Sequence, residues 1–317
     1  MSGRAAAFIA ALRDAVRGEV RADAPLARLS TYRIGGPATV FLPAAPEDLA
    51  AGLRAAAGAG VPVFVLGLGS NVLLPDEGME ALVIRMGKGL DRIRSDGDRW
   101  WFGAGLPAPL AARKTAEQGW AGLHMMVGVP GSVGGGIFMN AGCHGGQWSD
   151  VTTRVMVLDL DGSDRVLAAS EIPFTYRQSG LAGSVVVEAE VRLRTGSAEE
   201  LSAEVQKLFA WRQSGTPFNQ PCCGSVFKNP GGPPPPGWEG AWTAGRLLES
   251  AGLKGTMTGG IQISPMHANY FVNTGSGTAS DVRALIAKAR DQVRERFGLT
   301  LETEVKLIGS GGEPLHV

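Results

Sequence analysis

The chain has 317 residues, no formal net charge at pH 7, and 44% hydrophobic against 19% charged residues. These values are typical of a globular protein of two or three domains, and the absence of a basic stripe argues against a nucleic-acid partner. No apolar run reaches the roughly 20 residues of a membrane span. Three cysteines without CxxC spacing and four histidines offer no metal-ligand pattern, so we expect a reduced, cytoplasmic protein with no metal and no membrane partner.

Glycine is the exception to this ordinary composition. Its 46 residues are about twice the average usage, and they concentrate near residues 67–70 and 128–146. Dense glycine indicates backbone that adopts positive φ or closely approaches another group. The pattern therefore indicates a ligand that the main chain binds.

The first third of the chain alternates helix and strand signals. Residues 5–17 predict an amphipathic helix, because the charged residues at its end argue against a signal peptide. Pro46 and the acidic residues after it open a second helix that glycines end near residue 58. Val61–Leu66 is a continuous apolar run, typical of a buried strand. The other expected elements are strands at 38–42, 82–86 and 99–102 and a helix at 108–118.

The remaining two thirds predict a strand-rich region followed by a smaller mixed domain, and hence an α+β fold. Val187–Leu193 alternates apolar and polar residues, which indicates a sheet with one wet face, and Asp161-Gly162 indicates a hairpin turn. Ser197 and Glu200 form a capping box that opens a helix to about residue 211. The further expected elements are strands at 154–160, 185–194, 260–264, 270–273 and 301–308, and helices at 243–251 and 280–297.

The first glycine motif directly follows the buried strand at 61–66. Gly67 and Gly69 predict a nest of backbone N–H groups that binds an anion, and Ser70 and Asn71 add side-chain donors. The motif is not a Rossmann fingerprint, because the third glycine would fall at Val72 and no clear helix follows. An ordinary tight turn is the alternative.

The second glycine motif is the segment 128–142. It has five glycines in nine residues, which is unfavourable in conformational entropy unless a ligand or close packing requires them; a closely packed corner is the alternative. Two separate nests would suit the two phosphates of a dinucleotide. The expected cofactor-binding residues here are Val129, Gly131, Ser132, Gly134, Gly135, Asn140 and Gly142.

Three polar clusters lie outside the glycine motifs. Arg177 lies in a loop between β segments, where its planar fork would bind a carboxylate or remain an ordinary surface group. Ser225 follows a glycine but lacks the G-x-S-x-G elbow, so it does not indicate a hydrolase. Glu302 and Glu304 share one face of the strand expected there, and this face would be either catalytic or merely solvated.

Together these motifs resemble the MurB reductases, which reduce UDP-N-acetylglucosamine enolpyruvate to UDP-N-acetylmuramate in cell-wall synthesis. Leu29–Ala38 is similar to the opening signature of that family, and the other motifs follow in the family's order over residues 27–309. These motifs are Gly67–Leu73, Gly128–Gly142, Tyr176-Arg177, Gly224–Pro230, Gly245–Gly255, His267–Asn269 and Leu301–Val305. The connection from Arg177 to Val185 has no room for the insertion of the larger type, so the chain resembles the shorter, type II, form.

The resemblance implies a vanillyl-alcohol-oxidase/PCMH-type FAD-binding domain followed by a smaller α/β substrate-binding domain. We expect an N-terminal helix at 1–22, the FAD-binding domain at 23–196 and the substrate-binding domain at 197–317, in a monomer or weak oligomer. The implied cofactors are non-covalent FAD and, as hydride donor, NADPH. The rival interpretations are another flavin oxidase on this fold and a non-catalytic nucleotide-binding protein. Covalent-flavin oxidases often carry His or Cys in the first glycine motif, and Gly67–Leu73 has neither.

The resemblance also implies residue roles. Hydride passes from the flavin N5 to the enolpyruvyl CH2, and Ser225 gives a proton to the adjacent carbon. Arg177 and Glu304 stabilise the intervening enolate, with Glu304 protonated or held close to Arg177. Substrate contacts are implied for Lys228, Asn229 and His267, and Lys228 is also a candidate to stabilise the serine alkoxide.

Overall fold

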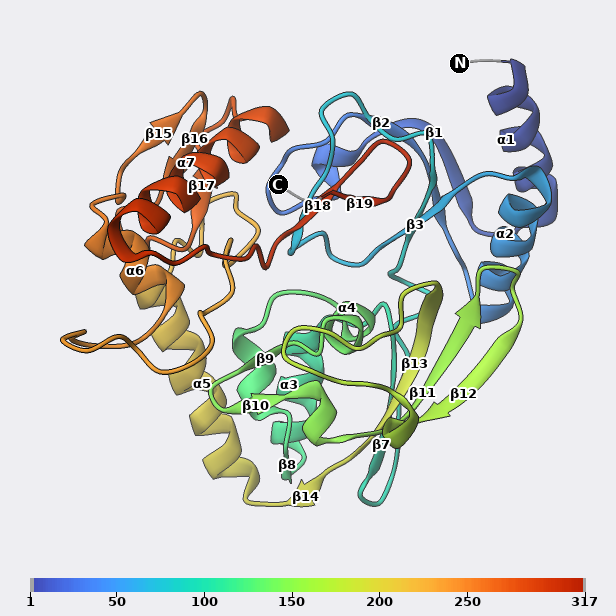
Figure 1. Cartoon of the computed structure of the whole chain (residues 1–317). Helices are drawn as coiled ribbons and strands as arrows, with labels where there is room; N and C mark the ends of the chain where they lie inside the picture. Colours follow the sequence, from blue (N-terminus) through green and yellow to red (C-terminus); the bar gives the residue numbers. More distant parts are fainter. Residues whose placement is uncertain (1–2, 316–317) are drawn as a thin grey trace. The chain divides into compact units, whose positions relative to one another are not determined.

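A computed structural model describes residues 3–315 (Figure 1), and its contacts divide the chain into two compact units, each with its own hydrophobic core. The first unit contains the chain up to Ala24, Ala38–Leu68 and Met79–Trp211, and the second contains Pro25–Pro37, Gly69–Gly78 and the chain from Arg212 onwards. The units interleave along the chain, whereas the domains expected at 1–22, 23–196 and 197–317 are consecutive. Those boundaries remain a prediction.

The first unit contains a four-stranded sheet in the order β1-β2-β5-β3, in which β2, β5 and β3 run parallel. α1 and α2 pack against each other beside it (Figure 1). Asp48 is buried and accepts hydrogen bonds from the backbone N–H groups of Arg17 and Gly18 at 2.7 and 2.8 Å, so it fixes the turn between α1 and β1. The bounds are α1 Gly3–Ala15, β1 Glu19–Pro25, β2 Pro37–Leu42, α2 Pro46–Ala59, β3 Val63–Leu66 and β5 Leu82–Arg85.

The same unit contains a five-stranded antiparallel sheet in the order β12-β11-β13-β7-β6. Along β13, Val187, Ala189 and Val191 are buried and the residues between them are not, which confirms the sheet with one wet face. Gly162 has a φ of 82° in the turn from β11 to β12, as the hairpin prediction requires. The bounds are β6 Ile93–Asp96, β7 Arg99–Gly103, β11 Thr152–Asp159, β12 Asp164–Ala168 and β13 Ser184–Arg192.

Shorter elements complete the first unit. α4 packs against β13, and the unit also contains the two-stranded sheets β9-β10 and β14-β8. The boundary between the units falls within α5, which begins at Ala198 as the capping box predicts. The bounds are α3 Ala108–Glu117, β8 Trp120–Ala121, α4 Val133–Phe138, β9 Gly142–Cys143, β10 Gly146–Gln147, β14 Arg194–Thr195 and α5 Ala198–Gly215, with 3-10 helices at His124–Gly128, Trp148–Asp150 and Ala169–Glu171.

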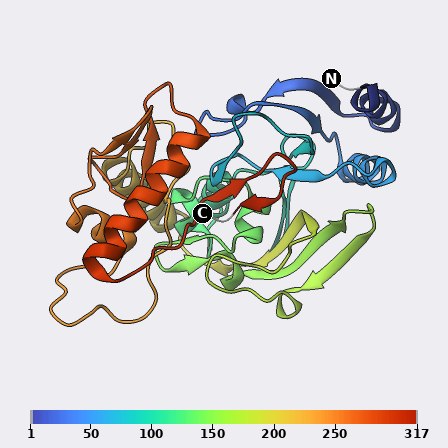
Figure 2. The ribbon, with the colours of Figure 1, turned by 45° about the horizontal axis from the view of Figure 1, so that its top comes forward.

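The second unit contains two three-stranded sheets, β15-β16-β17 and β19-β18-β4. α7 lies along β15 and β16 (Figure 2). Its N-terminus is capped by Thr278, and Asp76 accepts a hydrogen bond from the N–H of Ala279 at 2.8 Å. The bounds are β4 Val72–Leu73, α6 Ala244–Ser250, β15 Met257–Thr258, β16 Ile261–Ile263, β17 Phe271–Asn273, α7 Ala279–Phe297, β18 Lys306–Ile308 and β19 Pro314–Leu315, with a 3-10 helix at Leu26–Arg28.

The structure differs from the predictions made from the sequence at three places. The strand expected over 301–308 is formed only by Lys306–Ile308, because residues 301–305 make a single isolated bridge. The N-terminal helix ends at Ala15, and residues from Glu19 onwards form a strand instead of continuing the helix to residue 22. The glycines of the second motif lie partly in α4, which the sequence did not predict. Among residues 3–315, no helix is long and apolar enough to cross a membrane.

Candidate active site

The first glycine motif is a turn between β3 and β4. Gly67 packs so closely against Ser132 that an added Cβ would lie 2.6 Å from its Oγ, and Gly69 has a φ of 67°. Gly69 therefore requires glycine, and a side chain at Gly67 would displace the Ser132 hydroxyl. The boundary between the units falls after Leu68, and Asn71, in the second unit, donates from Nδ2 to the backbone oxygen of Glu304 at 3.3 Å.

The second glycine motif combines packing with exposed backbone. Ser132 caps α4 by accepting a hydrogen bond from the N–H of Gly135 at 3.3 Å. A side chain at Gly134 would collide with Ala104, and one at Gly136 with Trp148, so close packing explains these two glycines. Gly135, by contrast, is exposed and has only Ser132 Oγ near its missing Cβ, at 3.5 Å. Its open backbone keeps it a candidate for cofactor contact.

A partly buried cation lies at the same edge as the first glycine motif. Arg85 ends β5 in register with Leu66, the residue before Gly67. Its Nη1 is buried and has no hydrogen-bond partner among the described residues, and burial lowers the pKa of this guanidinium. A buried donor atom without a hydrogen-bond partner is costly, and ligands of parallel sheets bind at the carboxyl ends of the strands. The residues present therefore fit an anionic cofactor such as FAD.

Sequence reasoning missed Arg85. The signal that could have revealed it is the charged residue that closes an otherwise apolar strand, Leu82–Arg85. Asn269, for which the sequence indicated no role of its own within the His267–Asn269 motif, is buried in the second unit. Its side-chain amide accepts from Phe227 N at 2.9 Å and donates to Phe227 O at 2.8 Å. This pairing fixes the backbone two residues beyond Ser225.

The segment that carries Ser225 runs between two others in the second unit. Ser225 forms a backbone bridge with Tyr270 on one side. On the other side, Glu304 donates its backbone N–H to the oxygen of Val226 at 2.8 Å. The structure thus brings together two predicted catalytic residues that lie far apart in the sequence, Ser225 and Glu304.

The two glutamates of Leu301–Val305 differ in their surroundings. The carboxylate of Glu302 pairs with Lys228 Nζ at 3.1 Å, and its side chain is 77% exposed. Glu304 is half-buried, close enough to Cys223 for its charge to add to the main effect of burial in raising the pKa of that thiol. Burial, followed by the charge of Lys228, lowers the pKa of Lys306, and Glu304 opposes this effect. Glu304 therefore lies in partly enclosed surroundings near Cys223 and Lys306, whereas Glu302 is exposed to solvent.

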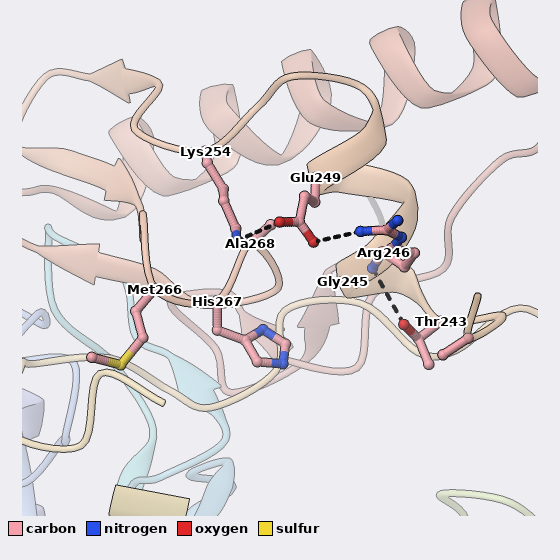
Figure 3. A pocket seen from close by; sticks show the side chains of 9 residues that line it. Thr243, Gly245, Arg246, Glu249, Lys254, Met266, His267 and Ala268 are labelled. Carbon is pink, nitrogen blue, oxygen red and sulfur yellow. Dashed lines mark hydrogen bonds and ion pairs between the residues drawn. The ribbon is translucent and has the colours of Figure 1, made fainter. Parts of the chain in front are cut away.

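A pocket of about 250 Å³ opens beside α6 in the second unit (Figure 3). Two cations line it, Arg246 and Lys254, and both bind the carboxylate of Glu249, at 3.4 and 2.6 Å. Its other lining residues are Ala241, Thr243, Gly245, Met266, His267 and Ala268. With one carboxylate between two cations, the pocket carries excess positive charge and suits an anionic ligand.

His267 contributes a neutral donor to this pocket. Its Nδ1 accepts a hydrogen bond from the N–H of Asn269 at 3.2 Å, and burial lowers the pKa of the imidazole. The neutral ring therefore carries its proton on Nε2. An added Cβ at Gly245 would lie 2.9 Å from the ring, so the glycine in the first turn of α6 makes room for the histidine (Figure 3).

Asn229 and Arg177 complete the predicted catalytic and substrate-binding residues. Asn229 accepts a hydrogen bond on Oδ1 from the N–H of Ala244, the first residue of α6, at 3.1 Å, so it is tied to the helix that lines the pocket. Arg177 lies in the first unit, where its Nη2 donates to the backbone oxygen of Gly142 at 3.0 Å. Ser225, Lys228, Asn229, His267 and Glu304 all belong to the second unit.

Comparison with known proteins finds two matching family models. Residues 37–168 match the FAD binding domain family, and residues 216–308 match the C-terminal domain of UDP-N-acetylenolpyruvoylglucosamine reductases. The reductase of Halalkalibacterium halodurans is 42% identical over 305 residues, 95% of this chain and 98% of the relative. That of Rubrobacter xylanophilus is 42% identical over 90% of this chain and 94% of its own. The crystal structure of the Thermus caldophilus reductase (MurB) has a TM-score of 0.76 and 33% identity over 92% of this chain and 99% of that one.

Residues 37–168 match the family of FAD-binding domains, and the glycine turn beside the partly buried Arg85 lies within this range. The chain is therefore a flavoprotein with an FAD-binding domain and an α+β fold, as expected from the sequence. The match of residues 216–308 to the C-terminal domain of these reductases narrows the class of protein further. The chain belongs to the UDP-N-acetylenolpyruvoylglucosamine reductase family.

Proposed function

We propose that this protein reduces the enolpyruvyl ether of UDP-N-acetylglucosamine to UDP-N-acetylmuramate, the peptidoglycan precursor, with NADPH as reductant. The observation that carries the proposal is the backbone pairing of Glu304 with Val226 at 2.8 Å, next to Ser225. A proton donor and a carboxylate from distant segments are held together there. A nucleotide-binding module without catalysis would not need this pair.

FAD would be held by residues of the first unit. We infer that the open backbone at Gly135 and the positive-φ glycine at Gly131 approach the cofactor, and that Arg85 balances the charge of its phosphates. When bound, FAD supplies two-electron chemistry, in which a hydride taken from NADPH is delivered to the terminal CH2 of the enolpyruvyl group. Side chains of the protein stabilise the charge and supply the proton in the remaining steps of the reaction.

Three residues of this chain manage the charge and the proton. As the CH2 carbon gains hydride, negative charge spreads from the adjacent carbon onto the carboxylate of the substrate, and the guanidinium of Arg177 matches the planar geometry of that carboxylate. Ser225 Oγ then gives its proton to the adjacent carbon, which completes a CH–CH3 group. Glu304 stabilises the same enolate in its protonated form, in which its carboxyl group donates a hydrogen bond to the developing negative charge.

The nucleotide end of the substrate would occupy the pocket beside α6. Its pyrophosphate is anionic, and the pocket offers Arg246, Lys254 and the Nε2–H of neutral His267. Lys228 and Asn229 lie on the segment that continues from Ser225 and extend the polar surface. We place the reaction in the cytoplasm and expect a monomer or weak oligomer.

The test is a pair of anaerobic half-reactions with the FAD-loaded protein. NADPH should bleach the flavin absorbance, and addition of the UDP-enolpyruvyl sugar should restore it with formation of UDP-N-acetylmuramate, detected by mass spectrometry. Because the N5 hydrogen of a reduced flavin exchanges with solvent, the same reaction run in D2O should place one deuterium in the new methyl group and one on the adjacent carbon. Recovery of the absorbance with oxygen but not with the sugar would instead identify an oxidase.

A further inference from the structure

Arg177 occupies one of the two central positions of a tight turn. Thr175 N donates to Gln178 O at 3.0 Å, and Gln178 N donates to Thr175 O at 3.2 Å, so Tyr176 and Arg177 lie between them. Arg177 has a φ of 59°, a left-handed conformation that is unfavourable for a non-glycine residue. The direction of its guanidinium therefore depends on the groups that hold the turn.

The segment that follows α4 holds this turn at two points. Asn140 donates from Nδ2 to the backbone oxygen of Thr175 at 3.0 Å. Arg177 itself donates from Nη2 to the backbone oxygen of Gly142 at 3.0 Å. The first contact fixes the backbone at the start of the turn, and the second fixes the guanidinium.

A third contact closes the turn from the other side. The hydroxyl of Ser179, which is buried, donates to the backbone oxygen of Phe138 at 2.7 Å. The first residue of the turn (Thr175), a central residue (Arg177) and the residue after the turn (Ser179) are thus bound to one five-residue segment, 138–142.

Asn140 is the centre of this arrangement. It is only 1% exposed, and its Nδ2 also donates to Gln147 Oε1 at 3.3 Å while its Oδ1 accepts from Ser149 N at 3.0 Å. Both amide hydrogens and the oxygen are therefore used within the protein. A buried amide with all its partners in place is held in one orientation, so this side chain can transmit its position to Thr175.

We propose that Asn140 is a positioning residue for Arg177: it holds the 175–178 turn so that the guanidinium faces the carboxylate of the substrate. The sequence groups Asn140 with the cofactor-binding residues, whereas its contacts assign its side chain to the sugar-reducing half of the reaction. The inference rests on the proposed function, because it takes Arg177 as the group that binds the carboxylate.

The test begins with Asn140→Asp, which keeps the shape and tolerates the φ of 41° at this position. The new carboxylate cannot donate to Thr175 O and repels it, so sugar reduction should slow about 10- to 100-fold, the usual effect of a displacement of about 1 Å. FAD content and flavin bleaching by NADPH should stay within twofold of the parent protein. Asn140→Gly, which removes the amide and suits positive φ, gives the same reading if the aspartate variant does not fold.

Gln147→Ala is the matched control, because Gln147 accepts from the same amide but does not touch the turn; sugar reduction should change less than about twofold. Trypsin provides a readout independent of activity. Cleavage after Arg177, identified by a fragment that begins at Gln178, should be faster in Asn140→Asp than in the control.

A double mutant distinguishes a role of Asn140 in positioning Arg177 from a general role of Asn140 in the stability of the fold. If Asn140 acts through Arg177, adding Asn140→Asp to Arg177→Ala should cause no further loss of sugar reduction. Multiplied losses, or equal slowing of flavin bleaching, would overturn the proposal and leave Asn140 with the cofactor or the fold. If Arg177→Ala alone leaves sugar reduction unchanged, the role of Arg177 in the proposed function fails first, and the inference fails with it.

Discussion

Glu302 and Glu304 lie two residues apart, yet only Glu304 is partly enclosed. Glu304→Gln keeps the shape of the side chain but removes its acidic proton, so we expect sugar reduction to fall steeply while FAD binding and flavin bleaching persist. Glu302→Gln removes only the partner of Lys228 on an exposed surface, and either half-reaction should change less than about fivefold, under 1 kcal/mol of barrier. Stopped-flow measurement of both half-reactions checks this. An exchange of the two phenotypes would refute the assignment.

Ser225 is the residue whose loss should separate the two halves of the reaction. Ser225→Ala should leave flavin bleaching by NADPH nearly intact, because that half places no proton on a carbon of the sugar. Flavin reoxidation by the enolpyruvyl substrate should slow by about 10²–10⁴, the usual contribution of a positioned proton donor. Equal slowing of both halves would show that Ser225 serves the cofactor or the fold.

The sequence could indicate these residue types but not their surroundings. Glu302 and Glu304 were expected on one face of a strand, and no local pattern distinguishes them; only the resemblance chose Glu304. The structure supplies the missing distinction, because residues 301–305 are not a regular strand and the pairing of Lys228 with Glu302 depends on a contact between distant segments. Such contacts leave no periodic signal in the sequence.

At the scale of elements, Asn229 joins a loop to the start of α6. Asn229→Ala should lower the free energy of unfolding by about 1 kcal/mol, as other losses of a helix-terminal acceptor do, and should raise the KM of the sugar substrate. Asn229→Asp separates these effects, because its oxygen still accepts from Ala244 N while its charge repels a pyrophosphate. Urea denaturation and steady-state kinetics measure the two. A normal KM in Asn229→Asp would make Asn229 a helix cap alone.

Arg85 ends β5 with a buried Nη1 that has no partner among the described residues. Arg85→Met keeps much of the apolar stem and removes the charge. We expect FAD affinity to fall about tenfold, the equivalent of about 1.4 kcal/mol, while the FAD-free protein keeps or gains stability because a buried donor without a partner is gone. Flavin fluorescence titration and thermal unfolding of the apoprotein test the two effects. A loss of apoprotein stability with unchanged FAD affinity would give Arg85 a structural role.

Element prediction succeeded where a strong local signal exists and failed where tertiary contacts decide. Val187–Leu193 carries a clear period of two, and α7 has both a capping box at Thr278 and a terminal Gly298 at a φ of 68°. α4 was missed because three of its six residues are glycine, which disfavours a helix by about 1 kcal/mol each. Its packing against β13 and the cap by Ser132 compensate for this low propensity.

At the scale of the whole molecule, the cofactor should be removable. The purified protein should be yellow with about one FAD per chain, and acid precipitation should release all of it, because the first glycine motif offers no His or Cys for a covalent bond. Adding FAD back at about 100 times its Kd should raise the unfolding free energy by about 2.7 kcal/mol. Absorbance of supernatant and pellet is the measurement, and flavin retained in the pellet would contradict the prediction.

The division into two interleaved units could not be predicted from the sequence. Pro25–Pro37 and Gly69–Gly78 join the second unit through contacts such as Asn273 Nδ2 to Tyr32 O at 3.1 Å and Ala279 N to Asp76 Oδ1 at 2.8 Å. These bonds link residues more than 200 positions apart. Composition and periodicity describe neighbours in the chain, so they place boundaries only where the local pattern changes.

This interleaving constrains the order in which the protein can form during its synthesis. The strip Met79–Trp211 emerges from the ribosome before most of the second unit exists, so the first unit can fold early. The segments 25–37 and 69–78 hydrogen-bond to each other, for example from Thr31 N to Gly69 O at 3.0 Å. Tyr32 O and the carboxylate of Asp76, however, bind residues of β17 and α7, which are synthesised much later. A nascent chain stalled before residue 273 would therefore expose the segments 25–37 and 69–78, still without their contacts to β17 and α7, to proteases and chaperones. The second unit begins in the first tenth of the chain and is completed only by the final third.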